Sequence, residues 1–330
     1  MRRREFLILI AGAVGGSTHI AHALPEQTRR IAVLLNLAAD DLETKARLAA
    51  FQQRLKELGW SEGHNVRFDY RWGLGDVDQH RKNAAELIAL KPDVFLVHGS
   101  TIMGPLQRAT RTIPIVFVSV SDPIAGGFVA SLAKPGGNAT GFTSTDYGMS
   151  GKWMELLKQI APHVTRVGVI RDPDQVSGGG QLGAIQAVAP LLGVQFSTLG
   201  VRDAKEIETA IANFAGQPNG GLIVTTSALA QIHRQQIIEL AAKYRLPTIY
   251  PYRLFVSDGG LMCYAPQILE QYRDAASYVD RIFRGEKPAD LPVQQPSKFE
   301  LIINAKTANA LGLTVPPAML ARADEVIEKY

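Results

Sequence analysis

The chain has 330 residues, of which 46% are hydrophobic and 20% are charged, and its 35 basic residues nearly balance its 31 acidic ones. This balance, with no Lys/Arg-rich stretch beyond Arg4, excludes a nucleic-acid-binding surface of the usual basic kind. Cys263 is the single cysteine, so an internal disulfide is excluded and burial of a core must stabilise the fold.

Residues 1–23 are predicted to be a secretory signal peptide. Arg2, Arg3 and Arg4 precede a short apolar stretch at 6–16, and Ala21-His22-Ala23 has the A-x-A form of a cleavage site. The Arg3-Arg4 pair also fits a twin-arginine signal, so the export route stays open. The apolar stretch is too short to span a bilayer core of about 30 Å. Cleavage after Ala23 removes three Arg and one Glu, which leaves 32 basic and 30 acidic residues in a periplasmic protein.

Beyond Arg29, short β-branched runs alternate with amphipathic stretches. The short runs favour strands that are buried on both faces, and the amphipathic stretches favour helices that cover them. Strict alternation predicts right-handed βαβ units and a parallel sheet. In the first half the predicted strands are 30–35, 65–72, 94–98, 113–120 and 139–143, and the predicted helices are 42–58, 79–90 and 102–110.

The stretch 113–142 is the most informative part of the chain. Its apolar run ends in Ser119, Ser121 and Asp122, and open α/β sheets bind ligands at that carboxyl end. A short helix is predicted at 125–132, and the turn cluster 135–138 must end it. The next predicted strand, 139–143, then leads toward a second domain.

A second set of alternating elements follows without a low-complexity linker. Its predicted helices are 152–160, 181–192, 204–214 and 232–244, and its strands are 166–170, 194–199, 222–225 and 248–252. The tail adds a short strand after Gly260, an amphipathic helix at 268–284, a strand at 299–303 and a helix from Lys306. A mature chain of about 300 residues exceeds one core, so two lobes are expected. Tail elements that pack on either lobe would make the chain cross between them several times, as in a hinge.

Four polar segments stand at the ends of predicted strands: 36–41, 99–101, 121–123 and 225–227. Capping explains any single segment, because Ser, Thr, Asp and Asn are the preferred helix caps. Convergence on one cleft favours binding, because helix N-termini accept anions and binding sites use a few convergent polar groups. Asp122 is the candidate for a ligand ammonium, and Ser100 and Thr101 for a carboxylate. The full set of candidate ligand-binding residues is Asn36, Ser100, Thr101, Ser121, Asp122, Arg171, Asp172, Thr225, Thr226, Tyr250 and Tyr264.

Other motifs carry less weight. Gly178-x-Gly180-x-x-Gly183 with Asp203 beyond it fits a dinucleotide fingerprint, but residues 171–177 separate it from the preceding strand. A glycine-rich helix N-terminus that lines a cleft is the preferred interpretation. The histidines lack metal-ligand spacing, so no metal or other cofactor is predicted. His98 ends a strand and either faces a ligand or lies at the sheet edge. No G-x-S-x-G elbow or assignable triad is present.

The chain resembles the substrate-binding proteins of ABC transporters, in the group with tryptophan- and tyrosine-binding members. The resemblance covers about 29–328, and its most distinctive segment is Lys134-Pro135-Gly136-Gly137-Asn138-Ala139-Thr140-Gly141. The segments 91–94, 113–117, 122–123, 151–157, 259–262, 289–293, 296–301 and 307–312 carry it further. It implies a type I periplasmic binding fold, with two Rossmann-like lobes joined by three hinge crossings. The lobes are then expected at 29–142 plus 264–292, and at 143–263 plus 293–330.

Two segments depart from the family pattern near the expected cleft. Cys263-Tyr264-Ala265 stands where Ser-Tyr-Gly is expected, and Arg171-Asp172-Pro173 stands where Asn-Pro is common. The ligands of the better-known members therefore do not carry over directly. Arg171 can pair with a ligand carboxylate or with Asp172 or Asp174.

These observations predict a periplasmic solute-binding component of an ABC importer with no catalytic activity. Its partners are a small ligand, an amino acid or related carboxylate, and an inner-membrane permease, with no nucleic acid; the protein is expected to be a monomer. One alternative is a secreted α/β enzyme, a hydrolase or NAD-type oxidoreductase, that uses the same cleft. The missing nucleophile arrangement opposes it. A ligand-sensing protein for a signalling receptor is a second alternative, which nothing in the chain opposes.

Overall fold

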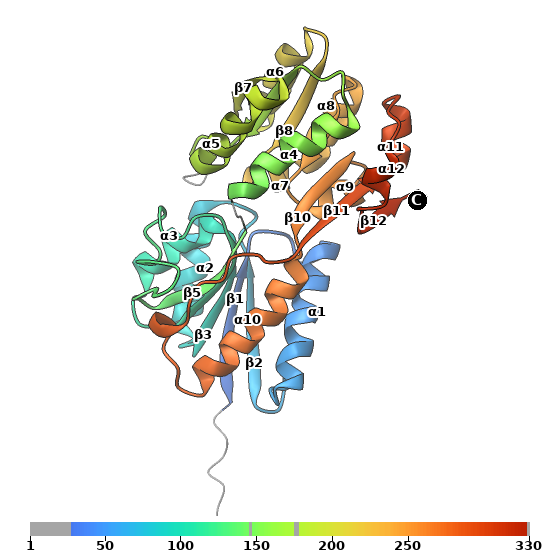
Figure 1. The fold of residues 1–330 in the computed structure, drawn as a ribbon. Coiled ribbons are helices and arrows are strands. Elements are labelled where there is room, and N and C mark those ends of the chain that lie inside the picture. The colour runs from blue at the N-terminus through green and yellow to red at the C-terminus, as the bar shows by residue number, and fades with distance from the viewer. Residues whose placement is uncertain (1–27, 145–146, 175–177, 329–330) are drawn as a thin grey trace, which may run out of the picture.

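A computed structural model describes residues 28–144, 147–174 and 178–328, and it has two α/β lobes (Figure 1). The predicted signal peptide lies outside the described residues. Each lobe has one sheet, five strands in the first and seven in the second. In the described part of the chain, no helix is long and apolar enough to cross a membrane.

The first lobe is built on a parallel sheet in the order β2-β1-β3-β4-β5. Side chains of β1 alternate between its faces, which gives each face a core. Ile31 and Val33 belong to the core under α1 and α10, and Ala32 and Leu34 to the core under α2 and α3. The elements are β1 (Arg29–Leu35), α1 (Leu42–Glu57), β2 (Val66–Trp72), α2 (Val77–Ala89), β3 (Val94–His98), α3 (Ser100–Ala109), β4 (Ile115–Val120), β5 (Ala139–Thr143) and α10 (Ile268–Phe283).

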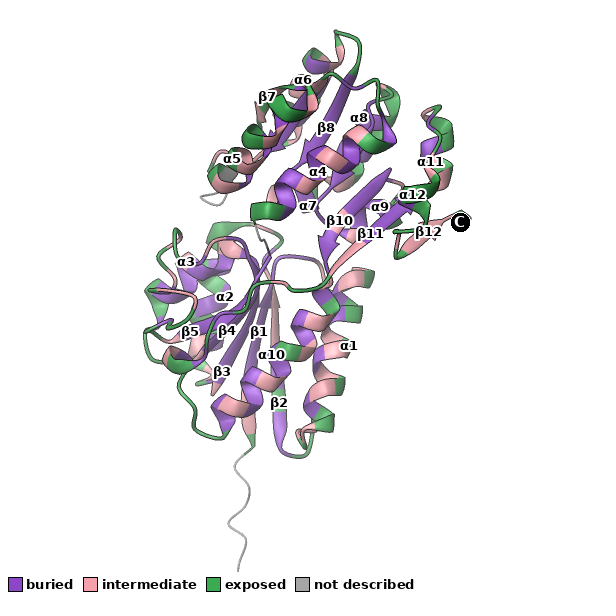
Figure 2. Cartoon of the chain, viewed as in Figure 1, coloured by how far each residue is buried: buried purple, intermediate pink, exposed green. Residues whose placement is uncertain are grey.

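The second lobe has the strand order β12-β11-β10-β9-β8-β6-β7, parallel except where β10 pairs with β11. Its inner strands are also buried on both faces, whereas the edge strands β7 and β12 are partly or largely exposed (Figure 2). The first elements are α4 (Tyr147–Ile160), β6 (Arg166–Arg171), α5 (Gly178–Val188), η1 (Ala189–Leu192), β7 (Gln195–Gly200), α6 (Ala204–Ala215), β8 (Gly220–Val224), α7 (Ala228–Ile232) and α8 (Arg234–Lys243). The others are β9 (Thr248–Tyr250), α9 (Arg253–Ser257), β10 (Met262–Pro266), β11 (Phe299–Asn304), α11 (Ala305–Ala310), α12 (Pro317–Leu320) and β12 (Glu325–Ile327). The short element η2 (Pro288–Asp290) belongs to the first lobe, where it contacts β5.

The chain passes between the lobes after β5, after β10 and before β11 (Figure 1). Two of the expected lobe boundaries, at Tyr264 and Val293, come a few residues before the chain crosses between the lobes in the structure. Tyr264 was expected to open the return to the first lobe, but it lies within β10 and pairs with Leu301 in the second sheet. Val293 was expected in the second lobe, but it belongs to the core under α2 and α3, and its N–H bonds the Leu132 carbonyl in the first lobe.

The prediction of a helix at 125–132 is wrong. The segment forms turns, in which the N–H groups of Phe128 and Val129 both donate to the Pro123 carbonyl. Gly127 has φ of 68° and ends any helical path there. The remaining predicted elements are present, with ends shifted by a few residues and with 232–244 divided at His233. The short elements α9, α12 and β12 were not predicted, because each is too short to carry a periodic pattern.

Candidate functional site

The N-terminus of α3 lies at the junction of the lobes and has no side-chain cap. Its N-cap, Gly99, has φ of 93°, and a Cβ there would lie 2.3 Å from the Asn36 amide nitrogen, so only glycine fits. The Thr101 hydroxyl donates to Asn36 Oδ1 at 3.1 Å, and Ser100 Oγ accepts from the Ser121 N–H at 3.0 Å. Three predicted strand tips therefore meet at the start of α3, where the N-cap residue Gly99 supplies no capping side chain.

A layer of small polar side chains joins the two lobes. Ser121 of the first lobe and Thr226 of the second are both buried, and their hydroxyl oxygens are 3.4 Å apart. The Ser144 hydroxyl donates to Ser121 Oγ at 3.0 Å, and the Thr226 hydroxyl donates to Gln181 Oε1 at 3.1 Å. The lobes are therefore in contact through hydrogen bonds, as expected for a closed clamp.

Asp122 connects the lobes beside this layer. Its Oδ1 accepts from the Ala125 N–H at 2.9 Å, which is a capping contact, and its Oδ2 accepts from the Tyr147 hydroxyl of α4. Burial, followed by the Asp122 hydrogen bond and charge, raises the pKa of Tyr147, so the hydroxyl stays protonated and donates. The ring of Tyr147 packs on Gly180, where a Cβ would lie only 2.3 Å from it.

Arg171 and Asp172 follow β6 on the second lobe. Arg171 Nε is buried and has no hydrogen-bond partner within the described residues. Asp172 accepts from the Asp174 N–H at 2.9 Å. Burial raises the pKa of Asp172, and the charge of Asp174 adds to this, while Arg171 lowers it. This half-buried pair offers an unsatisfied donor next to an acid that is more easily protonated than usual.

Three of the expected residues have other structural roles. The Thr225 hydroxyl donates to the Ile170 carbonyl at 2.9 Å, and Tyr250 is buried in the second-lobe core, stacked on Phe255. Tyr264 stacks on Phe299 and its carbonyl accepts from Trp153 Nε1. The structure thus brings together Asn36, Ser100, Thr101, Ser121, Asp122 and Thr226, but not Thr225, Tyr250 or Tyr264.

Other motifs of the sequence also find structural explanations. Asp203, the acid of the dinucleotide pattern, caps α6 by accepting from the Glu206 N–H. The three glycines of that pattern lie in the first turns of α5. Cys263 of β10 is buried in the second-lobe core, and this burial raises the pKa of its thiol. Among the described residues, no group of three or more His, Cys, Asp or Glu side chains could hold a metal ion.

Two polar residues near the cleft were missed or left open by sequence reasoning. Arg47 of α1 is 3% exposed, and its only ionic partner in the described chain is Glu43 at 3.7 Å. His98 is buried and stacked on Tyr272, and burial together with the Arg47 charge lowers its pKa well below the usual range. Arg47 lies in an ordinary amphipathic helix, so the sequence carries no signal that singles it out.

A cavity of about 650 Å³ opens at the junction, between the tip of β1 and the segment from α7 to α9. Its walls include Asn36 and apolar side chains of both lobes, Leu37, Leu74, Ile232 and Leu254. Arg234 of α8 spans the lobes at this cavity, 3.2 Å from Asp41 of the first lobe and 2.6 Å from Asp258 of the second. The volume is typical of small-molecule sites.

The family model of ABC transporter substrate-binding proteins matches residues 30–327. The chain belongs to this family. The family resemblance and the two-lobed α/β fold predicted from the sequence are thereby confirmed, and the chain is a substrate-binding protein of an ABC transporter.

Individual relatives agree with this assignment. The tyrosine-binding protein of Clostridioides difficile (strain R20291) is 26% identical over 269 residues, which is 80% of this chain and 75% of the relative. A conserved domain protein of Vibrio cholerae O1 biovar El Tor is 26% identical, with a TM-score of 0.84 over 91% of this chain and 100% of its own. An ABC domain from Streptococcus pneumonia in complex with L-Trp shares the fold, at 24% identity and a TM-score of 0.84, with the same coverage.

Proposed function

We propose that this protein is the exported, ligand-capturing component of an ABC importer, and that it binds an amino acid or a related small carboxylate between its lobes. The observation that carries the proposal is the uncapped α3 N-terminus, with Asp122 beside it at the same inter-lobe junction. A hydrogen-bond donor site and a carboxylate at neighbouring strand ends match the two charged groups of an amino acid.

The ligand carboxylate binds the first-turn N–H groups of α3. The N-cap residue Gly99 supplies no side-chain acceptor to those groups, and the positive end of the helix dipole favours an anion there. Ser100 and Thr101 supply these amides, and their hydroxyls already fix the neighbouring Ser121 and Asn36. The tip is thus ordered before the ligand arrives, which lowers the entropy cost of binding.

The ligand ammonium binds Asp122. Its carboxylate has two partners, Ala125 N–H and the Tyr147 hydroxyl, and a carboxylate has about four acceptor positions. Arg171 and Asp172 stand at the end of β6 in the second lobe and are the proposed partners of any further polar group on the ligand.

The ligand side chain is aromatic or branched and occupies the 650 Å³ cavity. Its apolar walls come from both lobes, so an apolar side chain gains most when the lobes are closed. Two similar proteins, a tyrosine-binding protein and a domain in complex with L-Trp, agree with an aromatic ligand. Differential contacts of this kind shift a hinge equilibrium toward the closed state, which the permease then recognises.

A thermal-shift screen of the mature protein against amino acids, aromatic acids, carboxylates and nucleosides tests the proposal. A ligand at 100 times its dissociation constant stabilises the protein by about 2.7 kcal/mol, which raises the unfolding temperature measurably. An amino acid should stabilise and its C-terminal amide should bind about tenfold to hundredfold more weakly, because the amide loses the charge-assisted bonds. Stabilisation by nucleosides alone, or equal binding of acid and amide, would contradict the proposed ligand class.

A further inference from the structure

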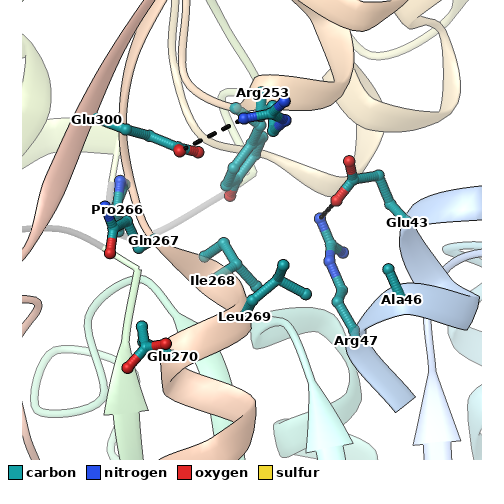
Figure 3. Close-up of a pocket in the computed structure, with 11 residues that line it drawn as sticks. Glu43, Ala46, Arg47, Arg253, Pro266, Gln267, Ile268, Leu269, Glu270 and Glu300 are labelled. Carbon is teal, nitrogen blue, oxygen red and sulfur yellow. Dashed lines mark ion pairs between the residues drawn. The ribbon is translucent and has the colours of Figure 1, made fainter. Parts of the chain in front are cut away.

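A second pocket lies at the second hinge crossing, on the side of α1 and α10 (Figure 3). Its volume is about 230 Å³, and it is lined by the first turns of α1 and α10 together with Tyr252, Arg253 and Glu300 of the second lobe. None of the side chains proposed to hold the cleft ligand lines it. The pocket exists only when the two lobes are together, because both contribute walls.

Arg47 brings an unused hydrogen-bond donor to this pocket, as far as the described residues show. The three acids on its walls each have a cationic neighbour: Glu43 has Arg47, Glu300 has Arg253, and Glu270 has Lys298. Arg253 is further paired with Glu325 at 2.5 Å. Arg47 Nε, by contrast, is buried and lacks a hydrogen-bond partner in the part of the chain that the structure describes.

A buried guanidinium with an unused donor is costly unless an anion completes its pairing. Its planar fork binds a carboxylate with two parallel hydrogen bonds. Figure 3 shows Arg47 and Glu43 on one side of the pocket and the Arg253–Glu300 pair on the other, with the apolar side chains of Ile268 and Leu269 between them. The volume lies below the roughly 300 Å³ at which pockets for drug-sized molecules begin, so the ligand is compact.

We propose that this pocket is a second binding site, which takes a compact monocarboxylate with an apolar body on Arg47 and stabilises the closed lobes. The carboxylate lies on the guanidinium, and the apolar body packs on Ile268 and Leu269. Because the site contains walls from both lobes, its occupancy and that of the cleft favour the same state. Each ligand therefore raises the affinity of the other by the same factor.

Calorimetric titration of the mature protein with benzoate, and with neutral benzamide, tests the site. Benzoate should bind, and Arg47→Met should weaken it about tenfold to hundredfold, the worth of a charge-assisted bond. Benzamide should bind wild type more weakly by a similar factor. Arg54→Met is the matched control, because Arg54 lies on the same helix, two turns on, pairs with Glu57 and does not line the pocket. It should leave benzoate binding unchanged.

Two further variants separate this site from the cleft. Leu269→Trp fills the pocket while keeping Arg47, and it should abolish benzoate binding without loss of the folded state, since Leu269 is 45% exposed. Asp122→Asn lies in the proposed cleft and keeps side-chain atoms that can hydrogen-bond Ala125 and Tyr147, so it should leave lobe contact and benzoate binding as they are. Benzoate binding that survives both Arg47→Met and Leu269→Trp, or that is lost in Asp122→Asn, would overturn the second site while leaving the proposed cleft function standing.

Discussion

Asp122 is the single residue on which the proposed amino-acid site depends most. Its contact with the Ala125 N–H is a cap, which Asn makes about as well as Asp. Its charge is needed only for a ligand ammonium. Asp122→Asn should therefore keep the fold but weaken the cleft ligand about tenfold to hundredfold in a calorimetric titration. Equal affinity of a folded variant would leave Asp122 as a cap and as a partner of Tyr147.

His80 gives the first lobe a pH dependence of known sign. Burial lowers its pKa to about 4, and both ring nitrogens lack partners in the described residues. Below pH 6.5 the His80 imidazole therefore binds a proton in the unfolded chain but not in the folded chain, so the stability of the fold decreases as the pH falls toward 4. Between pH 7 and pH 5 the loss from His80 should be about 2 kcal/mol in urea unfolding. His98, buried and also lowered in pKa, adds to the slope in the same direction.

The His80 contribution is isolated by comparing variants at both pH values. His80→Gln should unfold with about 2 kcal/mol less pH dependence than wild type. His163→Gln is the control, because His163 is exposed in the folded protein and unfolding changes its surroundings little. Equal slopes for wild type and His80→Gln would mean that His80 is not the group responsible.

At the scale of elements, the sequence predicts strands and long helices well and short or glycine-bent segments poorly. The runs 94–98 and 139–143 match β3 and β5 to the residue, because turn residues or helix caps bound them on both sides. The helix expected at 125–132 does not form, because Gly127 has a positive φ that a helix cannot contain. Of the site, the tips around Ser100, Ser121 and Thr226 were predicted, whereas Arg47 was not, since only the folded structure reveals its burial.

The glycine motif around β5 offers a test at this scale. Gly141 has φ of 149°, and a Cβ there would lie 1.9 Å from the Phe117 carbonyl oxygen of β4. Gly141→Ala should therefore lower the free energy of unfolding by about 3 kcal/mol, because the backbone of β4 at Phe117 must move to admit the new Cβ. Gly137→Ala is the matched control within the same motif, since nothing lies within 4 Å of its Cβ position. A silent Gly141→Ala in urea unfolding would contradict this close approach of β4 and β5.

At the scale of the whole molecule, Arg234 is the ionic contact between lobes at the cleft mouth. Arg234→Gln removes a partly exposed ion pair to Asp41 that exists only in the closed state, worth about 1 kcal/mol. Affinity for the cleft ligand should fall about fivefold at low salt and less at high salt. Arg202→Gln, which loses ion pairs within the second lobe only, should keep wild-type affinity. An equal effect of the two variants would show that the Arg234 pair does not favour closure.

In the proposed mechanism, a small ligand is captured between two lobes that close on it. Small-angle X-ray scattering of the mature protein, with and without the amino acid found in the thermal-shift screen, tests this closure. The cavity walls and the contacts from Asp122 to Tyr147 and from Ser121 to Thr226 join both lobes, so ligand should favour the compact form. We predict a smaller radius of gyration at saturating ligand. A saturating ligand that leaves the radius of gyration unchanged would contradict capture by closure.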